Sequence, residues 1–345
     1  MFQALRLITI ILVLVFLATP LHAQDAAGGG TLVRDVLGGA ALIFRRPDDP
    51  PVQTGGGTVS SGARVSTRRT ARTRASEKEQ VIAKANAARN APQPRYSEAE
   101  EQYRIAARLD PTDPRAYAGL GNIYIDQQRF PQAIAAYTEA LKLRPDYPAV
   151  LFPLGYALVG MNKSREAIEV YLQTLKLEPD NPEIYNNLGY AYNQVNDFEN
   201  AQKVCERAIE LLGQTGQAYR QGLQERNEVL AHTYKNLGNA YNGMRRYPDA
   251  VKALREATLL QPTNAAAHFN LGLAHYNAGQ NNEAIEAYKQ VLALKPKLAA
   301  AHYNLGLAYL AVRNITGALE EYNALKELNA QMANELHKMI DTLGR

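Results

Sequence analysis

Residues 117–124 read Tyr-Ala-Gly-Leu-Gly-Asn-Ile-Tyr, and this stretch decides the fold because its outline recurs along the chain. Each recurrence keeps a Leu-Gly pair, and the glycines are Gly121, Gly155, Gly189, Gly238, Gly272 and Gly306. The steps between successive glycines are 34, 34, 49, 34 and 34 residues. A constant step of this size indicates a stack of repeated supersecondary units, none of which can bury its apolar face alone.

Two further markers repeat with the same steps. One is an alanine in the second half of each repeat, at Ala133, Ala167, Ala201, Ala250, Ala284 and Ala318. The other is a proline near the repeat end, at Pro111, Pro145, Pro179, Pro262 and Pro296. From about residue 80 to residue 332 the pattern resembles the tetratricopeptide-repeat family. The resemblance implies an all-α fold: a right-handed superhelical solenoid of antiparallel helix pairs that binds other proteins.

Each marker has a physical role in such a helix pair. Repeat positions 4, 7, 8 and 11 have the spacing of one helix face. The glycine and the alanine are small, so the two helices can approach closely, and we expect a tyrosine to fill the remaining gap. The tyrosines concerned are Tyr103, Tyr137, Tyr171, Tyr288 and Tyr322. The proline ends the second helix and starts the next turn.

The markers divide the chain into six repeats, at 114–147, 148–181, 182–215, 231–264, 265–298 and 299–332. Residues 80–113 resemble a seventh, degenerate repeat whose polar first helix is expected to cap the stack. Residues 333–345 are assigned to a C-terminal capping helix, which is expected to begin at Ala330 and to cover the last apolar face.

One step of 49 residues leaves an insertion of 15 residues, assigned to 216–230. The pattern from Gln217 to Asn242 contains no proline and predicts one long helix, with about four added turns. Two interpretations stay open. The insertion carries a partner or self-association contact, or it is tolerated and packs on its own neighbours.

Residues 1–23 have the features of a secretory signal peptide. Arg6 supplies a positive charge, the run from Leu7 to Ala18 is apolar, and Pro20 precedes a small residue, Ala23, at the expected cleavage site. We therefore expect an exported protein that is periplasmic, attached to the cell envelope or secreted. The alternative is an uncleaved membrane anchor.

Residues 24–76 are rich in Gly, Ser, Thr, Pro and Arg and are interpreted as a disordered linker. This arm also holds the net positive charge, because the chain after residue 76 has 29 basic and 30 acidic side chains. Five arginines follow one another without an acidic residue between them, at Arg64, Arg68, Arg69, Arg72 and Arg74. They either bind an anionic surface or are solvated linker charges. Nucleic acid is disfavoured as the partner because no aromatic residue is interleaved for stacking.

The family resemblance implies that the first helices line an inner groove through repeat positions 2, 5, 6, 9, 12 and 13. A ladder of side-chain amides there could donate to and accept from an extended peptide backbone, and aromatic residues would form side-chain pockets. The candidate groove residues are Asn187, Tyr190, Lys235, Asn236, Asn239, Asn270, Tyr276 and Asn304. Asparagine is frequent at these positions in such repeats, so the alternative is a groove without a particular ligand.

Two relatives of this groove are informative. It is similar to the asparagine ladder of O-linked N-acetylglucosamine transferases, of which only the docking role carries over. It also resembles in part a chaperone-binding clamp for a C-terminal carboxylate, because Lys235, Asn239 and Asn270 match the first three clamp positions. Ala300 and Asn304 stand where that clamp needs two cations, which removes most of the charge-assisted binding.

No catalytic or cofactor motif is found in the sequence. Three histidines, His268, His275 and His302, occupy aromatic core positions of the repeat, and no carboxylate partner is evident, so no metal is expected. Cys205 occupies a buried aromatic position and is interpreted as a packed thiol. The sequence thus predicts a non-enzymatic, extracytoplasmic scaffold or adaptor that binds a protein or peptide in its groove. The alternatives are a structural subunit of an envelope or secretion assembly, and a docking module of a separate enzyme such as a glycosyltransferase.

Overall fold

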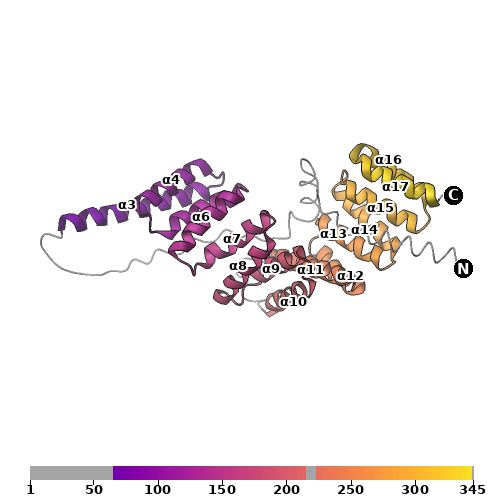
Figure 1. The fold of residues 1–345 in the computed structure, drawn as a ribbon, viewed down its shortest axis with the longest axis horizontal. Coiled ribbons are helices and arrows are strands. Elements are labelled where there is room, and N and C mark those ends of the chain that lie inside the picture. The colour runs from indigo at the N-terminus through magenta and orange to yellow at the C-terminus, as the bar shows by residue number, and fades with distance from the viewer. Residues whose placement is uncertain (1–64, 215–222, 344–345) are drawn as a thin grey trace. The chain divides into compact units, whose positions relative to one another are not determined.

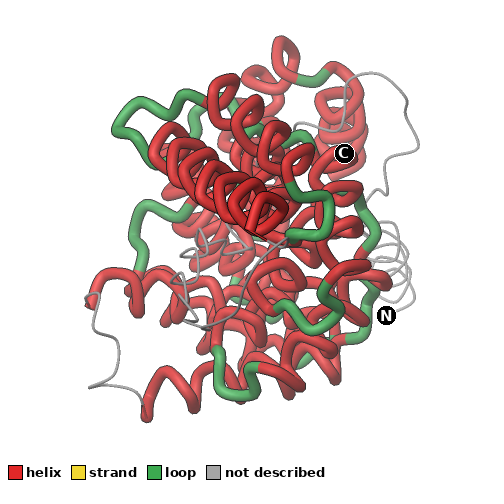
Figure 2. The backbone as a smooth tube through the Cα atoms, turned by 90° about the vertical axis from the view of Figure 1, so that its left-hand side faces the viewer, coloured by secondary structure: helices red, strands yellow, loops and turns green. Residues whose placement is uncertain are grey.

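The computed structural model describes residues 65–214 and 223–343. The interpreted signal peptide, residues 24–64, the first half of the insertion and residues 344–345 lie outside these ranges. The described residues form helices joined by short turns, and none of these residues forms a strand, as Figures 1 and 2 show. The expected all-α fold is confirmed.

The helices follow one another in pairs. The first helices of the pairs are α3 (Val65–Arg89), α5 (Pro114–Asp126), α7 (Pro148–Gly160), α9 (Pro182–Gln194), α11 (Leu223–Gly243), α13 (Ala265–Asn277) and α15 (Ala299–Ala311). The second helices are α4 (Tyr96–Leu109), α6 (Phe130–Leu143), α8 (Ser164–Leu177), α10 (Phe198–Gln214), α12 (Tyr247–Leu260), α14 (Asn281–Leu294) and α16 (Ile315–Leu328). A single helix, α17 (Ala330–Leu343), follows the last pair.

The first helices form the inner layer of the stack. In the described ranges, each first helix contacts the first helix of the next pair, whereas no second helix contacts the second helix of the next pair. Helices that approach each other across successive repeats lie on the more tightly curved side. The most extensive of these contacts joins α9 and α11, at the position of the insertion.

The repeat glycines let a side chain of the second helix approach the first helix. A Cβ atom added at Gly121 would lie 2.3 Å from the ring of Tyr137, and Gly155 and Gly272 have the same relation to Tyr171 and Tyr288. The expected tyrosine packing is confirmed at these three sites.

The other glycines have different partners. The expected contact of Tyr322 is wrong, because Leu336 of α17 fills the space at Gly306 and Tyr322 stacks on His337 instead. Tyr103 lies against Gly119 rather than against a glycine of its own repeat. The spaces at Gly189 and Gly238 are filled by Cys205 and Leu254, respectively.

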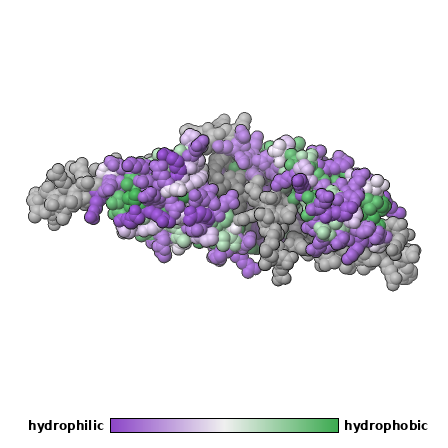
Figure 3. Space-filling view, turned by 90° about the horizontal axis from the view of Figure 1, so that it is seen from above, coloured by the Kyte–Doolittle hydropathy of each residue, from purple (hydrophilic) through white to green (hydrophobic). Residues whose placement is uncertain are grey.

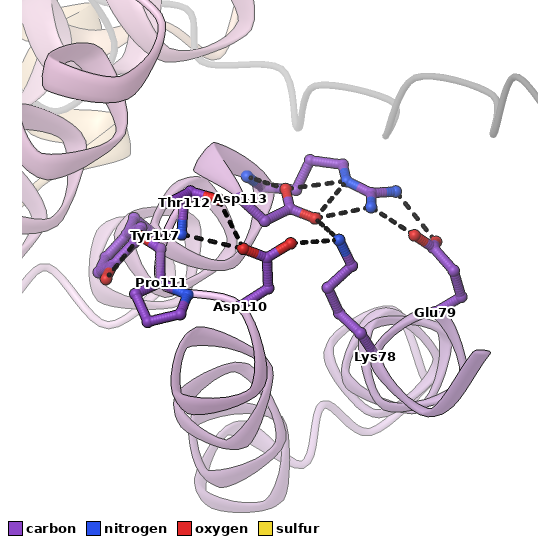
Figure 4. A network of polar contacts seen from close by, with 8 residues as sticks. Lys78, Glu79, Asp110, Pro111, Thr112, Asp113 and Tyr117 are labelled. Atoms are coloured by element: carbon purple, nitrogen blue, oxygen red, sulfur yellow. Dashed lines mark hydrogen bonds and ion pairs between the residues drawn. The ribbon is translucent and has the colours of Figure 1, made fainter. Parts of the chain in front are cut away.

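The linker prediction is wrong for its last residues. Helix α3 begins at Val65, so residues 65–76, assigned to a disordered linker, are helical. An ion network anchors the helix further along (Figure 4): Lys78 Nζ lies 2.8 Å from Asp110 Oδ2 and 2.8 Å from Asp113 Oδ2. Arg115 donates to Asp113 and to Glu79, with 3.0 Å from Arg115 Nη1 to Glu79 Oε2. The composition of residues 65–76 could not predict this helix, because the ion pairs that hold it join residues far apart in the sequence.

The helices on both sides of the insertion are longer than their counterparts in the other repeats. The second helix α10 has 17 residues where α6 and α8 have 14, and the first helix α11 has 21 residues where α5 and α7 have 13. The described part of α11 begins at Leu223, and residues 217–222 of the helix predicted from Gln217 lie outside the described residues. The lengthened ends pack together: Arg226 Nε donates to the Leu212 carbonyl at 2.9 Å, and Val229 is buried. This contact favours the interpretation in which the insertion packs on its own neighbours.

Among the described residues, no helix is both long and apolar enough to cross a bilayer. The face shown in Figure 3 is mostly hydrophilic, with apolar side chains in small separate areas.

Candidate functional site

The amide side chains on α9 and α11 connect the two inner helices. Asn236 Nδ2 donates to Asn186 Oδ1 at 3.0 Å and to the Asn186 carbonyl at 3.2 Å. In the other direction, Asn193 Nδ2 donates to the Asn236 carbonyl at 2.8 Å. Asn186, Asn187 and Asn236 are fully buried. Part of the asparagine ladder therefore holds the stack together, a role that the sequence did not predict for these residues.

An amide hydrogen bond also joins the next two inner helices, α11 and α13. Asn270 Nδ2 on α13 donates to Asn239 Oδ1 on α11 at 2.7 Å. On α15, by contrast, Asn304 Nδ2 donates to the Ala300 carbonyl of its own helix at 2.8 Å. The ladder thus links α9, α11 and α13, and it ends before α15.

Several buried polar atoms of this ladder have no hydrogen-bond partner in the described part of the chain. They are Lys235 Nζ, Asn193 Oδ1, Asn236 Oδ1 and Asn242 Oδ1. Native proteins leave few buried polar atoms unpaired, and each exception asks for a physical reason. Three carbonyl oxygens that can accept and one amine that can donate lie on two adjacent inner helices. A ligand that offers both N–H and C=O groups would suit them once the side chains that cover these atoms move aside.

Burial shifts the ionisation of the basic residues here. Lys235 is 1% exposed, and its desolvation lowers the pKa to about 8. Its neighbour His232 is 3% exposed, and burial together with the charge of Lys235 lowers the pKa of His232 to about 3. The histidine is therefore neutral at physiological pH, and Lys235 carries the positive charge of this pair.

Three tyrosines of the inner helices are partly exposed, namely the candidate groove residues Tyr190 and Tyr276 and, in addition, Tyr303. Tyr190 lies on α9, Tyr276 on α13 and Tyr303 on α15. Burial raises the pKa of Tyr276, and burial with the nearby charge of Glu335 raises the pKa of Tyr303 to about 12. Both phenols stay protonated, so they combine an apolar ring with a hydroxyl donor.

The arginines of the predicted anionic-surface segment belong to α3. Arg68, Arg69, Arg72 and Arg74 lie on this helix, and Arg74 is exposed; Arg64 lies outside the described residues. They are far along the chain from the amide ladder and form a separate candidate site.

The described residues contain no cluster of three or more potential metal ligands among His, Cys, Asp and Glu. The expectation that no carboxylate partners the histidines is wrong for His302, whose Nδ1 lies 2.6 Å from Glu321 Oε2. His275 Nδ1 lies 2.7 Å from Gln280 Oε1 and is buried. Cys205 is fully buried, which confirms the predicted packed thiol, and its burial raises the pKa of the thiol.

The repeated helix pairs and their inner amide surface define a helical-repeat protein with a surface suited to protein or peptide ligands. Profiles of the tetratricopeptide repeat match residues 235–299 and 273–333, and others match 121–162, 159–196 and 182–211. The chain belongs to the tetratricopeptide-repeat family. A comparison with curated proteins gives no match.

Solved structures of the same class resemble this chain. A tetratricopeptide repeat protein from Parabacteroides merdae has a TM-score of 0.56 and 17% identity over 77% of this chain and 99% of its own. The Cut9–Hcn1 hetero-tetramer of the APC/C gives a TM-score of 0.53 and 22% identity over 68% of this chain and 46% of the other. PilF of Pseudomonas aeruginosa gives 0.52 and 18%, over 66% and 98% of the two chains. At these identities the likeness concerns the fold.

Proposed function

We propose that this protein is an extracytoplasmic, non-catalytic adaptor that binds an extended peptide segment along α9, α11 and α13. The observation that carries the proposal is the cluster of buried polar atoms without partners, Lys235 Nζ with the oxygens of Asn193, Asn236 and Asn242. An extended backbone offers N–H and C=O groups alternately, as these side chains require. Tyr190 and Tyr276 lie on the same inner helices and would contact the side chains of the peptide.

The location outside the cytoplasm rests on the sequence of residues 1–23. The single cysteine is consistent with it, because a continuous helical core needs no disulfide. N-terminal sequencing of the protein purified from its source tests the location. A first residue at Gln24 is expected, and a chain that keeps residues 1–23 would show that the leader is retained.

Variants at atoms without protein partners test the peptide surface directly. Lys235→Met and Asn242→Leu remove such atoms, so they should preserve folding while they lower affinity. The matched control is Lys142→Met, which removes the same charge from the exposed surface of α6, where the side chain is 64% exposed. The probe is an arrayed library of unstructured peptides, from which the peptides that bind the unchanged protein are selected.

The expected result is that the selected peptides bind Lys142→Met normally and bind the two inner variants at least about tenfold more weakly, as loss of a buried charged or neutral hydrogen bond predicts. Equal affinity for all four proteins would show that peptides bind elsewhere, and failure to select any peptide would reject the proposal.

A further inference from the structure

The first half of α3 extends beyond the helix pair to which it belongs. Helix α3 has 25 residues, whereas its partner α4 has 14. Because the two helices form a hairpin, Asp110, directly after the end of α4, lies beside Lys78 of α3. Residues 65–77 therefore continue past α4 by about 20 Å of helix. Figure 1 shows this part as the indigo end of the helix. We call residues 65–77 the basic arm.

The base of the basic arm is held firmly to the stack. The ion network of Lys78, Glu79, Asp113 and Arg115 begins where the arm ends (Figure 4). Further along α3, Val81 and Ile82 are buried, and Arg89 Nε lies 2.9 Å from Asp126 Oδ2. By contrast, the four side chains at 74–77 are exposed. The arm is thus a helix that is anchored at one end and projects its other end.

The charge of the basic arm does not favour a free helix. Arginines occupy positions 68, 69, 72 and 74, and the first acidic residue after them is Glu77. Like charges four residues apart on a helix repel each other, and short isolated helices are marginal in water. The arm contains no aromatic residue and no large aliphatic residue other than Val65. Its chemistry therefore calls for an anionic partner, not for an apolar groove.

We propose that the basic arm docks on an anionic phospholipid surface. The charge complementarity is the argument: a projecting helix with four arginines matches a negatively charged headgroup layer. The missing apolar face means that the arm would lie against the headgroups and would not insert. A single-stranded nucleic acid fits less well, because such sites stack bases on aromatic side chains, which the arm lacks. The apolar run at residues 7–18, on the same N-terminal side, would also hold the arm at a bilayer in a chain that keeps it as an anchor.

The test measures binding of the full chain to phosphatidylcholine vesicles with and without phosphatidylglycerol, by flotation. Each arginine near an anionic surface contributes about a fivefold increase in partitioning. The variant with Arg68, Arg69, Arg72 and Arg74 all changed to Gln should therefore lose several hundredfold, on the order of that value taken four times. Binding of the unchanged protein should weaken steeply with added salt.

Two control variants show whether the charge of the basic arm, and not the total charge of the protein, drives vesicle binding. Changing the same four arginines to Lys keeps the charge and should retain binding. Changing Lys142, Lys163, Lys289 and Arg313 to Gln removes four exposed basic groups elsewhere and should also retain it. Thermal unfolding of the arm variants should match that of the unchanged protein, because the residues changed precede the packed part of α3.

Three outcomes would overturn the proposal. The first is that the Gln arm variant binds vesicles as well as the unchanged protein does. The second is that the variant changed at Lys142, Lys163, Lys289 and Arg313 loses as much binding as the Gln arm variant. The third is that the Gln arm variant loses as much binding on vesicles without phosphatidylglycerol as on vesicles with it. Tighter arm-dependent binding to a single-stranded oligonucleotide than to the anionic vesicles would overturn it in favour of nucleic acid. None of these results bears on peptide binding by the inner surface, which the Lys235 variant tests separately.

Discussion

At the scale of single residues, the turn between the two helices of a repeat is the clearest source of backbone strain. One residue in each such turn of the six full repeats has positive φ, at Gln128, Asn162, Asn196, Arg245, Gly279 and Arg313, and all but one carry a side chain. The conformation closes the helix end, as where the Arg129 N–H donates to the Tyr124 carbonyl at 2.7 Å. Residues with a Cβ atom are sterically strained in this conformation, so these turns are stable only because the flanking helices hold them.

Replacing such a residue with glycine should stabilise the protein. Arg313→Gly is expected to raise the free energy of unfolding by about 0.5–1 kcal/mol, because relief of strain exceeds the added entropy of the unfolded chain. The reciprocal control is Gly279→Ala, expected to lower it by about 1 kcal/mol. A Cβ added at Gly279 meets nothing within 4 Å, so this change reports backbone strain alone. Urea unfolding measures both, and a loss of stability in Arg313→Gly would contradict the strain argument.

A second residue-scale prediction concerns pH. Both ring nitrogens of His302 face acceptors, Glu321 Oε2 at 2.6 Å and the Pro296 carbonyl at 2.9 Å. The hydrogen bond to Glu321 raises the pKa of His302 above its ordinary value of 6.5, against the opposing effect of burial. The stabilisation is thus complete below 6.5 and is lost as pH rises through the raised pKa. Glu321→Gln should remove this loss, measured as unfolding free energy across pH. Identical pH profiles of the two proteins would show that the pair contributes nothing.

Residue spacing predicted much of the core, and its failures have physical causes. The period of 34 located Gly121 and Tyr137 in contact, because both are set by one local hairpin. The partner of Gly306 was missed because Leu336 belongs to α17, outside the repeat pattern. The asparagines of the inner surface were identified as a polar ladder, but their hydrogen bonds between α9 and α11 join residues 50 positions apart in the chain. The spacing of residues in the sequence does not predict how closely these two helices approach each other.

At the scale of elements, the attachment of α3 shows why a linker boundary is hard to place from composition. Residues 65–76 have no apolar face, so their pattern alone predicts no helix. The helix is nevertheless continuous with a segment that is fixed through Asp110, Asp113 and Arg115, more than 30 residues away. Burial raises the pKa of Asp113, but hydrogen bonds from Arg115 and Lys78 outweigh it and hold the pKa at about 2. This carboxylate is therefore the centre of the attachment.

Removing the charge of Asp113 should loosen α3 without unfolding the stack. Asp113→Asn keeps an oxygen that can cap α5, where Asp113 now accepts from the Arg115 backbone N–H at 3.0 Å. It leaves Lys78 and Arg115 without their shared partner, at an expected cost of about 2 kcal/mol. Hydrogen exchange should speed up in residues 78–89 and stay unchanged in α7 to α16. The exposed Asp146→Asn is the control, and equal exchange in both variants would place the anchor of α3 elsewhere.

At the scale of the whole molecule, stability should be a sum of repeats and the contacts between neighbours. Each helix pair touches only the pairs beside it, within the described residues. In such a stack, damage at one end spreads only as far as the contacts between neighbouring repeats carry it. The C-terminal end is the best place to test this, because a single helix, α17, covers the last pair and contacts both α15 and α16.

Leu336→Ala should therefore unfold the C-terminal repeats selectively. Leu336 is fully buried and occupies the space beside Gly306, so its removal leaves a cavity that costs about 2–4 kcal/mol. Loss of this contact uncouples α17 from α15, and hydrogen exchange should accelerate from α15 to α17, less in α13, and not in α5 to α8. The control is Leu343→Ala on the same helix, where the side chain is 47% exposed and little change is expected. A uniform acceleration across all repeats would instead show that the stack unfolds as one cooperative unit, and the additive description would fail.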